Sequence, residues 1–278
     1  MKKAVALMLI LLFIPSACAW AEGFALPRDA LSAIVIDGYT GEVLLEINAD
    51  TRVYPASTTK ILTVFLGFLL EDTERVVTIS SAAVRLPSDA VRIGLKAGEE
   101  VSLDDLLAAT LVKSGNDGAN AVAEAVAGDS KAFAQLMNSY AIGIGCTDTH
   151  FTNPSGLHDE EHYTTARDMA KIAFEAMQHE EFRAIAGIGR YILPETNLGA
   201  ERVLTSHGRA FFDNPQSDYY FAGANGLKTG YHEAAGYCFV ATAERNERLL
   251  IAAVFGCESY GACFRNAAAL LEYGFEKK

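Results

Sequence analysis

The chain has 278 residues, half of them hydrophobic, and a formal net charge of −12. This length and apolar content suffice for one large domain or two small ones with a buried core, and they argue against a disordered chain. The acidic balance, without any basic run, argues against nucleic acid and anionic membrane surfaces as partners.

The first residues have the pattern of a secretory signal peptide. Lys2 and Lys3 precede an apolar run over 4–14 and a stretch of small residues that ends at Ala21. We therefore predict a signal peptide over 1–21 and an exported mature chain over 22–278. A lipoprotein signal at Cys18 is the alternative. A retained membrane anchor is disfavoured, because a bilayer crossing needs roughly 18 to 20 apolar residues.

Two hairpins are predicted, one near each end of the mature chain. Alternating apolar residues over 33–37 and 42–47 flank a Gly-Tyr-Thr-Gly turn, and a second pair covers 236–242 and 248–255. The part between them is mainly helical, with capping residues before several apolar segments. The expected helices cover 61–70, 102–112, 117–127, 131–142, 165–177 and 264–273.

This order of elements predicts an α+β fold. The chain ends supply an antiparallel sheet, and the helical block forms an inserted lobe. The cleft between sheet and lobe is the expected site. Without an internal repeat or linker, residues 22–278 are expected to form a single domain with no further C-terminal domain.

A serine and a lysine open the most apolar predicted helix. Ser57 and Lys60 are three residues apart, which places both side chains on one helix face within hydrogen-bonding reach. Burial against the apolar run disfavours the charged lysine, which can then take the serine proton. Chance supplies on the order of one Ser-x-x-Lys per chain of this length, but this chain has only this one. We predict a serine nucleophile with a lysine base.

A polar triplet, Ser114-Gly115-Asn116, follows on a turn between two predicted helices. Alone it fits an ordinary interhelical turn, because all three residues are common there. In a site with Lys60, the Ser114 hydroxyl can relay a proton to a leaving amine. The Asn116 amide can hold a substrate carbonyl and the lysine.

A third triplet, Lys228-Thr229-Gly230, leads into the second hairpin. On an edge strand the lysine and threonine can bind a substrate carboxylate, and the glycine lets the substrate backbone approach. At ordinary residue frequencies, this triplet is expected by chance in only about a few per cent of chains of this length. Three such motifs in this order make coincidence a poor explanation.

With these motifs the sequence resembles the active-site serine penicillin-recognising enzymes, and among them the low-molecular-mass D-alanyl-D-alanine carboxypeptidases. The resemblance implies a β-lactamase/DD-peptidase-like fold with a five-stranded sheet. It also implies removal of the terminal D-alanine from peptidoglycan stem peptides ending in D-Ala-D-Ala, acylation by β-lactam antibiotics, and no metal or organic cofactor. It covers residues 28–275 and includes 54–60, 114–117, 150–154, 165–170, 226–230 and 271–275.

The resemblance also implies a role for each motif residue. Ser57 forms the acyl-enzyme and Lys60 is the general base. Ser114 and Asn116 serve proton transfer and substrate positioning. The backbone N–H groups of Ser57 and Tyr231 form the oxyanion hole.

The carboxylate-binding side departs from the family pattern. Lys228 and Thr229 are implied to bind the terminal carboxylate. Family members commonly carry an arginine just before the last helix that helps to hold it, and here Cys263 stands at that position. Arg265, two residues further on, is the candidate substitute.

Three other functions were weighed. His158 to His162 matches the His-x-x-Glu-His pattern of zinc peptidases, but it lies between a turn signal and the helix cap at Thr165, so we expect a solvated loop. A β-lactamase of class A would need a Glu-x-x-x-Asn after Ser114, and none is present. A non-catalytic sensor would need a signalling domain.

The cysteines of the mature chain match no zinc or redox spacing. We expect them to be small buried hydrophobes, and a disulfide, although the compartment permits one, is not indicated. They are Cys146, Cys238, Cys257 and Cys263.

Overall fold

A five-stranded antiparallel sheet carries the two ends of the described chain, with strand order β2-β1-β9-β8-β7. The computed structural model describes residues 24–277, so the predicted signal peptide lies outside them. The sheet strands are β1 (Ser32–Asp37), β2 (Val43–Ile47), β7 (Ala224–His232), β8 (Gly236–Arg245) and β9 (Arg248–Cys257).

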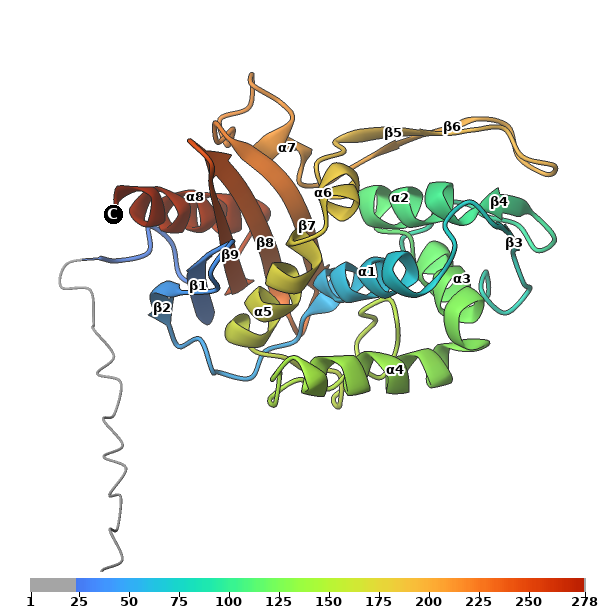
Figure 1. Cartoon of the computed structure of the whole chain (residues 1–278), viewed down its shortest axis with the longest axis horizontal. Helices are drawn as coiled ribbons and strands as arrows, with labels where there is room; N and C mark the ends of the chain where they lie inside the picture. The colour runs from blue at the N-terminus through green and yellow to red at the C-terminus, as the bar shows by residue number, and fades with distance from the viewer. Residues whose placement is uncertain (1–23, 278) are drawn as a thin grey trace, which may run out of the picture.

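The middle of the chain forms a helical lobe beside β7 (Figure 1). Its helices are α1 (Lys60–Leu70), α2 (Leu103–Lys113), α3 (Asn116–Ala127), α4 (Ser130–Gly143), α5 (Ala166–Met177) and α6 (Glu180–Ala186). The short helix α7 (Arg209–Phe212) and the long α8 (Tyr260–Glu276) follow. Two small ribbons, β3 (Val76–Thr78) with β4 (Glu100–Ser102) and β5 (Arg190–Leu193) with β6 (Arg202–Thr205), extend from the lobe.

Both faces of the sheet are covered, because strand residues of both parities are apolar. Val35 and Phe239 belong to a core beneath α8, whereas Ile34 and Val240 belong to a second core shared with the lobe. Each large buried apolar side chain stabilises the fold by about 1.5–3 kcal/mol. The sheet is thus a fixed wall against which the lobe packs.

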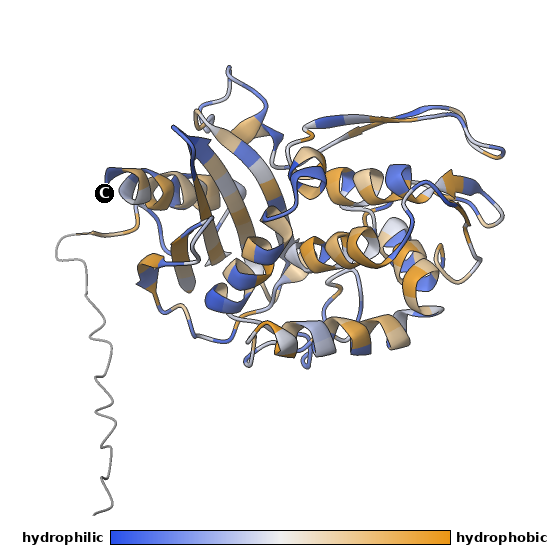
Figure 2. Ribbon diagram, in the orientation of Figure 1, coloured by the Kyte–Doolittle hydropathy of each residue, from blue (hydrophilic) through white to orange (hydrophobic). Residues whose placement is uncertain are grey.

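Helix α1 runs through the centre of the lobe. Its residues from Lys60 to Gly67 are all buried, and Figure 2 shows the helix in hydrophobic colours along most of its length. A helix that is apolar on all sides must be surrounded by protein. The residues at the N-terminal end of α1 are therefore held in a fixed position between the sheet and the lobe.

These observations confirm the α+β architecture, both hairpins and all six expected helices. Ser102 and Thr165 cap α2 and α5 by accepting hydrogen bonds from Asp105 N and Asp168 N. The last helix begins at Tyr260, four residues earlier than expected, because Ser259 caps it through Ala262 N. The two small ribbons were not predicted, since three- or four-residue strands carry too little alternation to be recognised.

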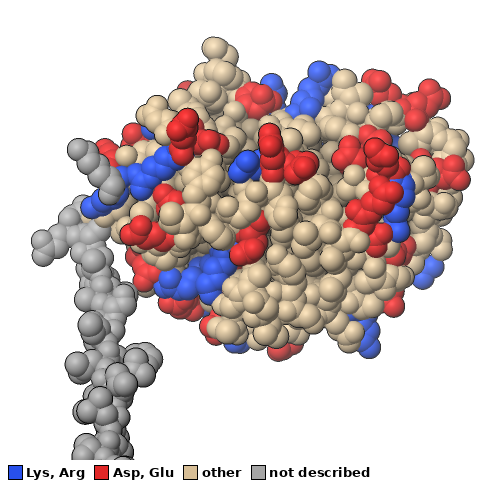
Figure 3. All heavy atoms as spheres, in the orientation of Figure 1, with Lys and Arg blue, Asp and Glu red and all other residues tan. Residues whose placement is uncertain are grey.

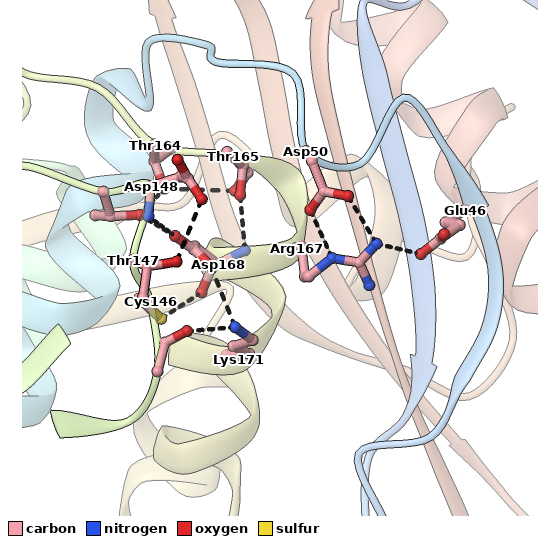
Figure 4. Close-up of polar contacts among 12 residues, drawn as sticks. Glu46, Asp50, Cys146, Thr147, Asp148, Thr164, Thr165, Arg167, Asp168 and Lys171 are labelled. Carbon is pink, nitrogen blue, oxygen red and sulfur yellow. Dashed lines mark hydrogen bonds and ion pairs between the residues drawn. The ribbon is translucent and has the colours of Figure 1, made fainter. Parts of the chain in front are cut away.

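The motif at 165–170 has a structural role, shown in Figure 4. Arg167 bonds Glu46 Oε2 at 2.6 Å and Asp50 Oδ1 at 2.6 Å, which ties α5 to the segment around β2. The buried Asp168 accepts from Asp148 N at 3.0 Å and from Thr149 Oγ1 at 2.9 Å. These contacts therefore hold α5 in position, and none of them involves the predicted nucleophile.

The surface is consistent with an acidic chain. On the face shown in Figure 3, Asp and Glu side chains are spread over the surface with Lys and Arg groups among them. Within residues 24–277, no helix is long and apolar enough to cross a membrane.

Candidate active site

Ser57 stands on a single 3₁₀ turn, Ala56–Thr59, directly before α1. Two glycines let other segments approach this turn. A side chain on Gly156 would collide with Ala56 O at 1.8 Å, and one on Gly230 would lie 3.0 Å from the Ser57 amide nitrogen. The turn is thus clamped between β7 and the 153–157 loop, and Ala56 itself has a φ of +47°.

The ammonium group of Lys60 occupies the centre of the predicted site. Its Nζ lies 3.0 Å from Ser57 Oγ, 2.7 Å from Asn116 Oδ1 and 2.6 Å from Ser155 O. The residue is fully buried. Three acceptors around one Nζ hold it against the serine hydroxyl without any substrate.

The environment of Lys60 favours the neutral amine. Burial is the main cause that brings the pKa of Lys60 well below its usual value, and the positive charge of Lys228 acts in the same direction. The carboxylate of Asp117 opposes them. A lysine with a depressed pKa can accept a proton near neutral pH, as a general base must.

The loop at 153–157 supplies the third acceptor. Asn153 Oδ1 accepts from the backbone N–H groups of Ser155, Gly156 and Leu157 at 3.1, 2.8 and 3.2 Å. Thr63 Oγ1 donates to Pro154 O at 2.6 Å, which joins the loop to α1. The turn was predicted from the sequence, but the role of the Ser155 carbonyl was not, because a backbone oxygen leaves no signature in the residue types.

The second predicted motif lies where expected, on the turn between α2 and α3. Ser114 has a left-handed φ of +64° and ends α2, while Asn116 is the first residue of α3. Asp117 accepts from the backbone N–H groups of residues 93, 94 and 95, which anchors the turn. Asn116 is joined to Lys60. In the described chain no hydrogen bond connects the Ser114 hydroxyl to Lys60 or Ser57.

The third motif lies on β7, which is the edge strand of the sheet, as predicted. Lys228 and Thr229 are both buried, and Lys228 Nζ donates to Thr229 O at 3.0 Å. Burial lowers the pKa of Lys228 to about 7. The positive charge of Lys228 therefore acts on the second buried lysine, Lys60, and lowers its pKa.

A row of aromatic side chains extends from β7. Tyr231, half exposed, stacks on Tyr237 with ring centroids 4.3 Å apart. The ring of Tyr260 contacts Tyr237 edge to face at 4.7 Å, and the nearby Thr229 side chain opposes the rise that burial causes in the pKa of its phenol. Tyr260 was not predicted from the sequence, because nothing in a lone tyrosine at a helix start marks it as part of a site.

Among the described residues, neither candidate for the family arginine is hydrogen-bonded to Thr229. Cys263 lies inside α8, fully buried, with Sγ 3.2 Å from Tyr237 O. Arg265 is exposed, and its guanidinium carbon lies 5.1 Å from the ring centroid of Tyr219. No hydrogen bond between an arginine and Thr229 occurs within the described chain.

The His158–His162 segment is a loop, as expected, but it is not solvated throughout. His162 is buried, with Nε2 2.9 Å from Thr59 Oγ1, and Nδ1 accepts from Thr152 N at 3.0 Å. Burial lowers the pKa of His162 to about 3. The exposed His158 instead packs near His232, beside a hollow of about 550 Å³.

This separation gives the two histidines of the motif different surroundings. Among residues 24–277 no group of three or more His, Cys, Asp or Glu side chains is arranged to hold a metal ion. His162 acts in the scaffold, since it links the loop at 150–154 to the turn that carries Ser57.

The four cysteines are buried, as predicted, and all four are free thiols. Burial raises the pKa of Cys146 and of Cys238 to about 12. Thiols with such values remain protonated at neutral pH and behave as small apolar side chains.

Comparison with known proteins gives a family match over most of the chain. Residues 24–259 match the model of the family Peptidase S11, described as D-alanyl-D-alanine carboxypeptidase. D-alanyl-D-alanine carboxypeptidase DacF of Bacillus subtilis is 32% identical over 289 residues, covering 100% of this chain and 72% of the relative. DacA of Escherichia coli is 33% identical over 259 residues, covering 89% of this chain and 61% of the relative.

Solved structures agree with this similarity. A D-alanyl-D-alanine carboxypeptidase from Mycobacterium tuberculosis superposes with a TM-score of 0.82 at 29% identity, covering 93% of this chain and 96% of that one. A DD-transpeptidase from Streptomyces superposes with a TM-score of 0.79 at 30% identity, covering 88% and 97%. These likenesses confirm the predicted fold class.

Proposed function

Because the chain belongs to the D-alanyl-D-alanine carboxypeptidase family, we propose that it removes the terminal D-alanine of peptidoglycan stem peptides through an acyl-enzyme on Ser57. The observation that carries this proposal is the buried Lys60 Nζ, 3.0 Å from Ser57 Oγ. A hydroxyl next to a neutral amine is the pairing that serine acyl transfer requires.

Acylation begins with proton transfer. Neutral Lys60 takes the proton of Ser57 Oγ while the oxygen attacks the carbonyl carbon of the D-Ala-D-Ala peptide bond. The carbonyl oxygen becomes an oxyanion, to which the backbone N–H groups of Ser57 and Tyr231 donate. The clamped turn matters here, because preorganised donors lower the barrier without reorganising during the reaction.

The tetrahedral intermediate then breaks its C–N bond. The leaving amine of D-alanine takes a proton that originates from the Lys60 ammonium, and the Ser114 hydroxyl relays it. Water next attacks the ester carbonyl with Lys60 again accepting the proton. Ser57 regains its proton as the ester bond breaks, so the enzyme returns to its starting state.

The substrate's terminal carboxylate lies at Lys228 and Thr229 in this proposal. An anion near Lys228 favours the charged ammonium and offsets the cost of its burial. Asn116 orients the substrate amide while holding Lys60 in place. Gly230 leaves room for the substrate backbone along β7.

The site of action follows from this substrate. Peptidoglycan lies outside the cytoplasmic membrane, so the proposal includes export of the mature chain through the predicted signal peptide. β-Lactams, which resemble the D-Ala-D-Ala end, are expected to acylate Ser57 and to inhibit the enzyme.

The decisive experiment uses a labelled penicillin and a pentapeptide ending in D-Ala-D-Ala. The mature chain should bind the label covalently and release D-alanine, Ser57→Ala should do neither, and the exposed Ser81→Ala should match the unaltered protein. Label retained by Ser57→Ala would remove that serine from the mechanism. Labelling without D-alanine release would indicate a penicillin-binding module without carboxypeptidase activity.

Transpeptidation is the second candidate, because the structural likeness includes a DD-transpeptidase. The same acyl-enzyme would then be attacked by an amine. To measure the balance between the two reactions, an acceptor peptide with a free glycine amine is added to the assay. The hydrolysis product is then separated from the amide product, and both are quantified.

A further inference from the structure

The carboxylate-binding corner, defined by Lys228, Thr229 and Tyr260, has no guanidinium hydrogen-bonded to it among residues 24–277. Cys263 is buried against the Tyr237 carbonyl, and Arg265 stacks over Tyr219. A buried lysine next to a hydroxyl would bind an anion, but a carboxylate has more acceptor sites than these two groups can fill. A further donor at this corner would complete its binding.

Tyr260 is placed to be that donor. It is the first residue of α8, whose capping by Ser259 fixes where the helix starts. Its ring is held edge to face by Tyr237 at 4.7 Å and stacks with Phe264 at 6.2 Å. The Thr229 hydroxyl lies close enough to the phenol to oppose the rise that burial causes in the pKa of Tyr260. Two ring contacts therefore hold the Tyr260 ring with its phenol beside Thr229.

The surroundings of Tyr260 are suited to an anion. The residue is only partly buried, so the phenol can meet a ligand that enters from solvent. Lys228 adds positive charge next to Thr229. His207 is also near, with its ring centroid 6.3 Å from that of Tyr260, and the positive charge of Lys228 reaches it. No carboxylate side chain is hydrogen-bonded or ion-paired to any of these groups in the described chain.

We propose that Tyr260 is a substrate-binding residue: its phenol, together with the Thr229 hydroxyl, donates a hydrogen bond to the terminal carboxylate of the peptide. In this chain a tyrosine at the start of α8 takes the part that the family commonly gives to an arginine. The inference rests on the proposed function, since it assigns a further contact to the same substrate.

This arrangement has a consequence for specificity. A phenol is a neutral donor, so it contributes a hydrogen bond to the carboxylate but no ion pair. A hydrogen bond to a charged group is stronger than one to a neutral group. Removing the Tyr260 hydroxyl should therefore weaken binding of a free carboxylate more than binding of a carboxamide at the same position.

The test compares two peptides that differ only at the C-terminus, one ending in D-Ala-D-Ala and one in its carboxamide. For each enzyme we would measure kcat/KM on both peptides and take their ratio. The ratio comes from one preparation, so a variant that is partly unfolded does not change it. Tyr260→Phe keeps the ring contacts, and Arg265→Ala is the matched variant at the alternative position.

Tyr260→Phe should lower kcat/KM for the free acid about tenfold, mainly through KM, with little change for the carboxamide. Arg265→Ala should leave the ratio unchanged. An equal loss on both peptides, an unchanged ratio in Tyr260→Phe, or a loss of the ratio in Arg265→Ala would overturn the inference. Failure of the proposed function would differ, because the unaltered chain would then cleave the D-Ala-D-Ala bond of neither peptide, releasing neither D-alanine nor D-alaninamide.

Discussion

The two lysines of the site are both buried, yet their surroundings differ. Lys60 Nζ meets a hydroxyl, an amide oxygen and a backbone carbonyl at 3.0, 2.7 and 2.6 Å. Lys228 Nζ has one hydrogen bond in the described chain, to Thr229 O at 3.0 Å. The first lysine has its acceptors in place before substrate arrives, and the second has donor capacity left over.

This difference separates the two tasks of a serine carboxypeptidase. Proton transfer needs a base of fixed position and depressed pKa, which the contacts and burial of Lys60 supply. Binding an anion needs donors that are still available, and the corner at Lys228, Thr229 and Tyr260 provides them. Substitutions at the first lysine should act on the rate of acylation, and those at the second on KM and on stability.

The largest effect is expected from Lys60→Met. Removing the base should slow acylation by penicillin about 10³-fold, within the range typical of general base catalysis. The apolar methionine fits a buried position, so the melting temperature should not fall. Time courses of labelling and thermal unfolding would measure both quantities. Lys113→Met, at the end of α2, is the control, and a Lys60→Met protein that acylates at the normal rate would contradict the assigned base.

A smaller effect is expected when Asn116→Asp places a carboxylate 2.7 Å from Lys60 Nζ. An opposite charge stabilises the ammonium, so the pKa of Lys60 should rise by about 1–3 units. The acid limb of the plot of kcat/KM against pH should move to higher pH by the same amount, and activity at pH 7 should fall. An acid limb that stays in place would show that another group limits the rate at low pH.

Lys228→Met should affect stability in a defined pH range. The pKa of Lys228 is about 7 in the folded chain against 10.5 for an ordinary lysine. Below pH 7 both folded and unfolded states carry the charge, so the full cost of burying it applies, and this cost falls between pH 7 and 10.5. Each pKa unit corresponds to about 1.4 kcal/mol, so the methionine variant should gain on the order of 5 kcal/mol below pH 7.

Urea unfolding between pH 5 and 9 checks this expectation. The difference in free energy of unfolding between Lys228→Met and the unaltered chain should be constant up to about pH 7 and then narrow. Lys131→Met, at an exposed position on α4, should show no such dependence. A gap that widens with pH would mean that the lysine is stabilised in its charged form.

The sequence predicted more of the Lys60 side than of the Lys228 side, for physical reasons. Ser57 and Lys60 were identified because helix spacing and the apolar run of α1 constrain them locally, and Asn116 because it stands in a polar triplet on a predicted turn. The carbonyl of Ser155 contacts Lys60, about 95 residues earlier in the chain, and the phenol of Tyr260 lies near Thr229, about 30 residues earlier. No local sequence pattern encodes contacts between such distant segments. His162 was predicted to be solvated for the same reason, since its burial depends on the turn at Thr59.

The polar cluster on α5 offers the smallest effect, and it tests whether the frame and the site are separable. Arg167 is partly exposed and pairs with Glu46 and Asp50. Exposed ion pairs are screened by water, so Arg167→Ala should cost about 1 kcal/mol in the free energy of unfolding, less at high salt, and should leave acylation unchanged. Arg190→Ala, on β5, is the matched control. Urea unfolding at two salt concentrations, with penicillin labelling of the folded variant, measures both. If Arg167→Ala slowed acylation at full folding, the contact between α5 and the β2 segment would have to be counted as part of what positions Ser57.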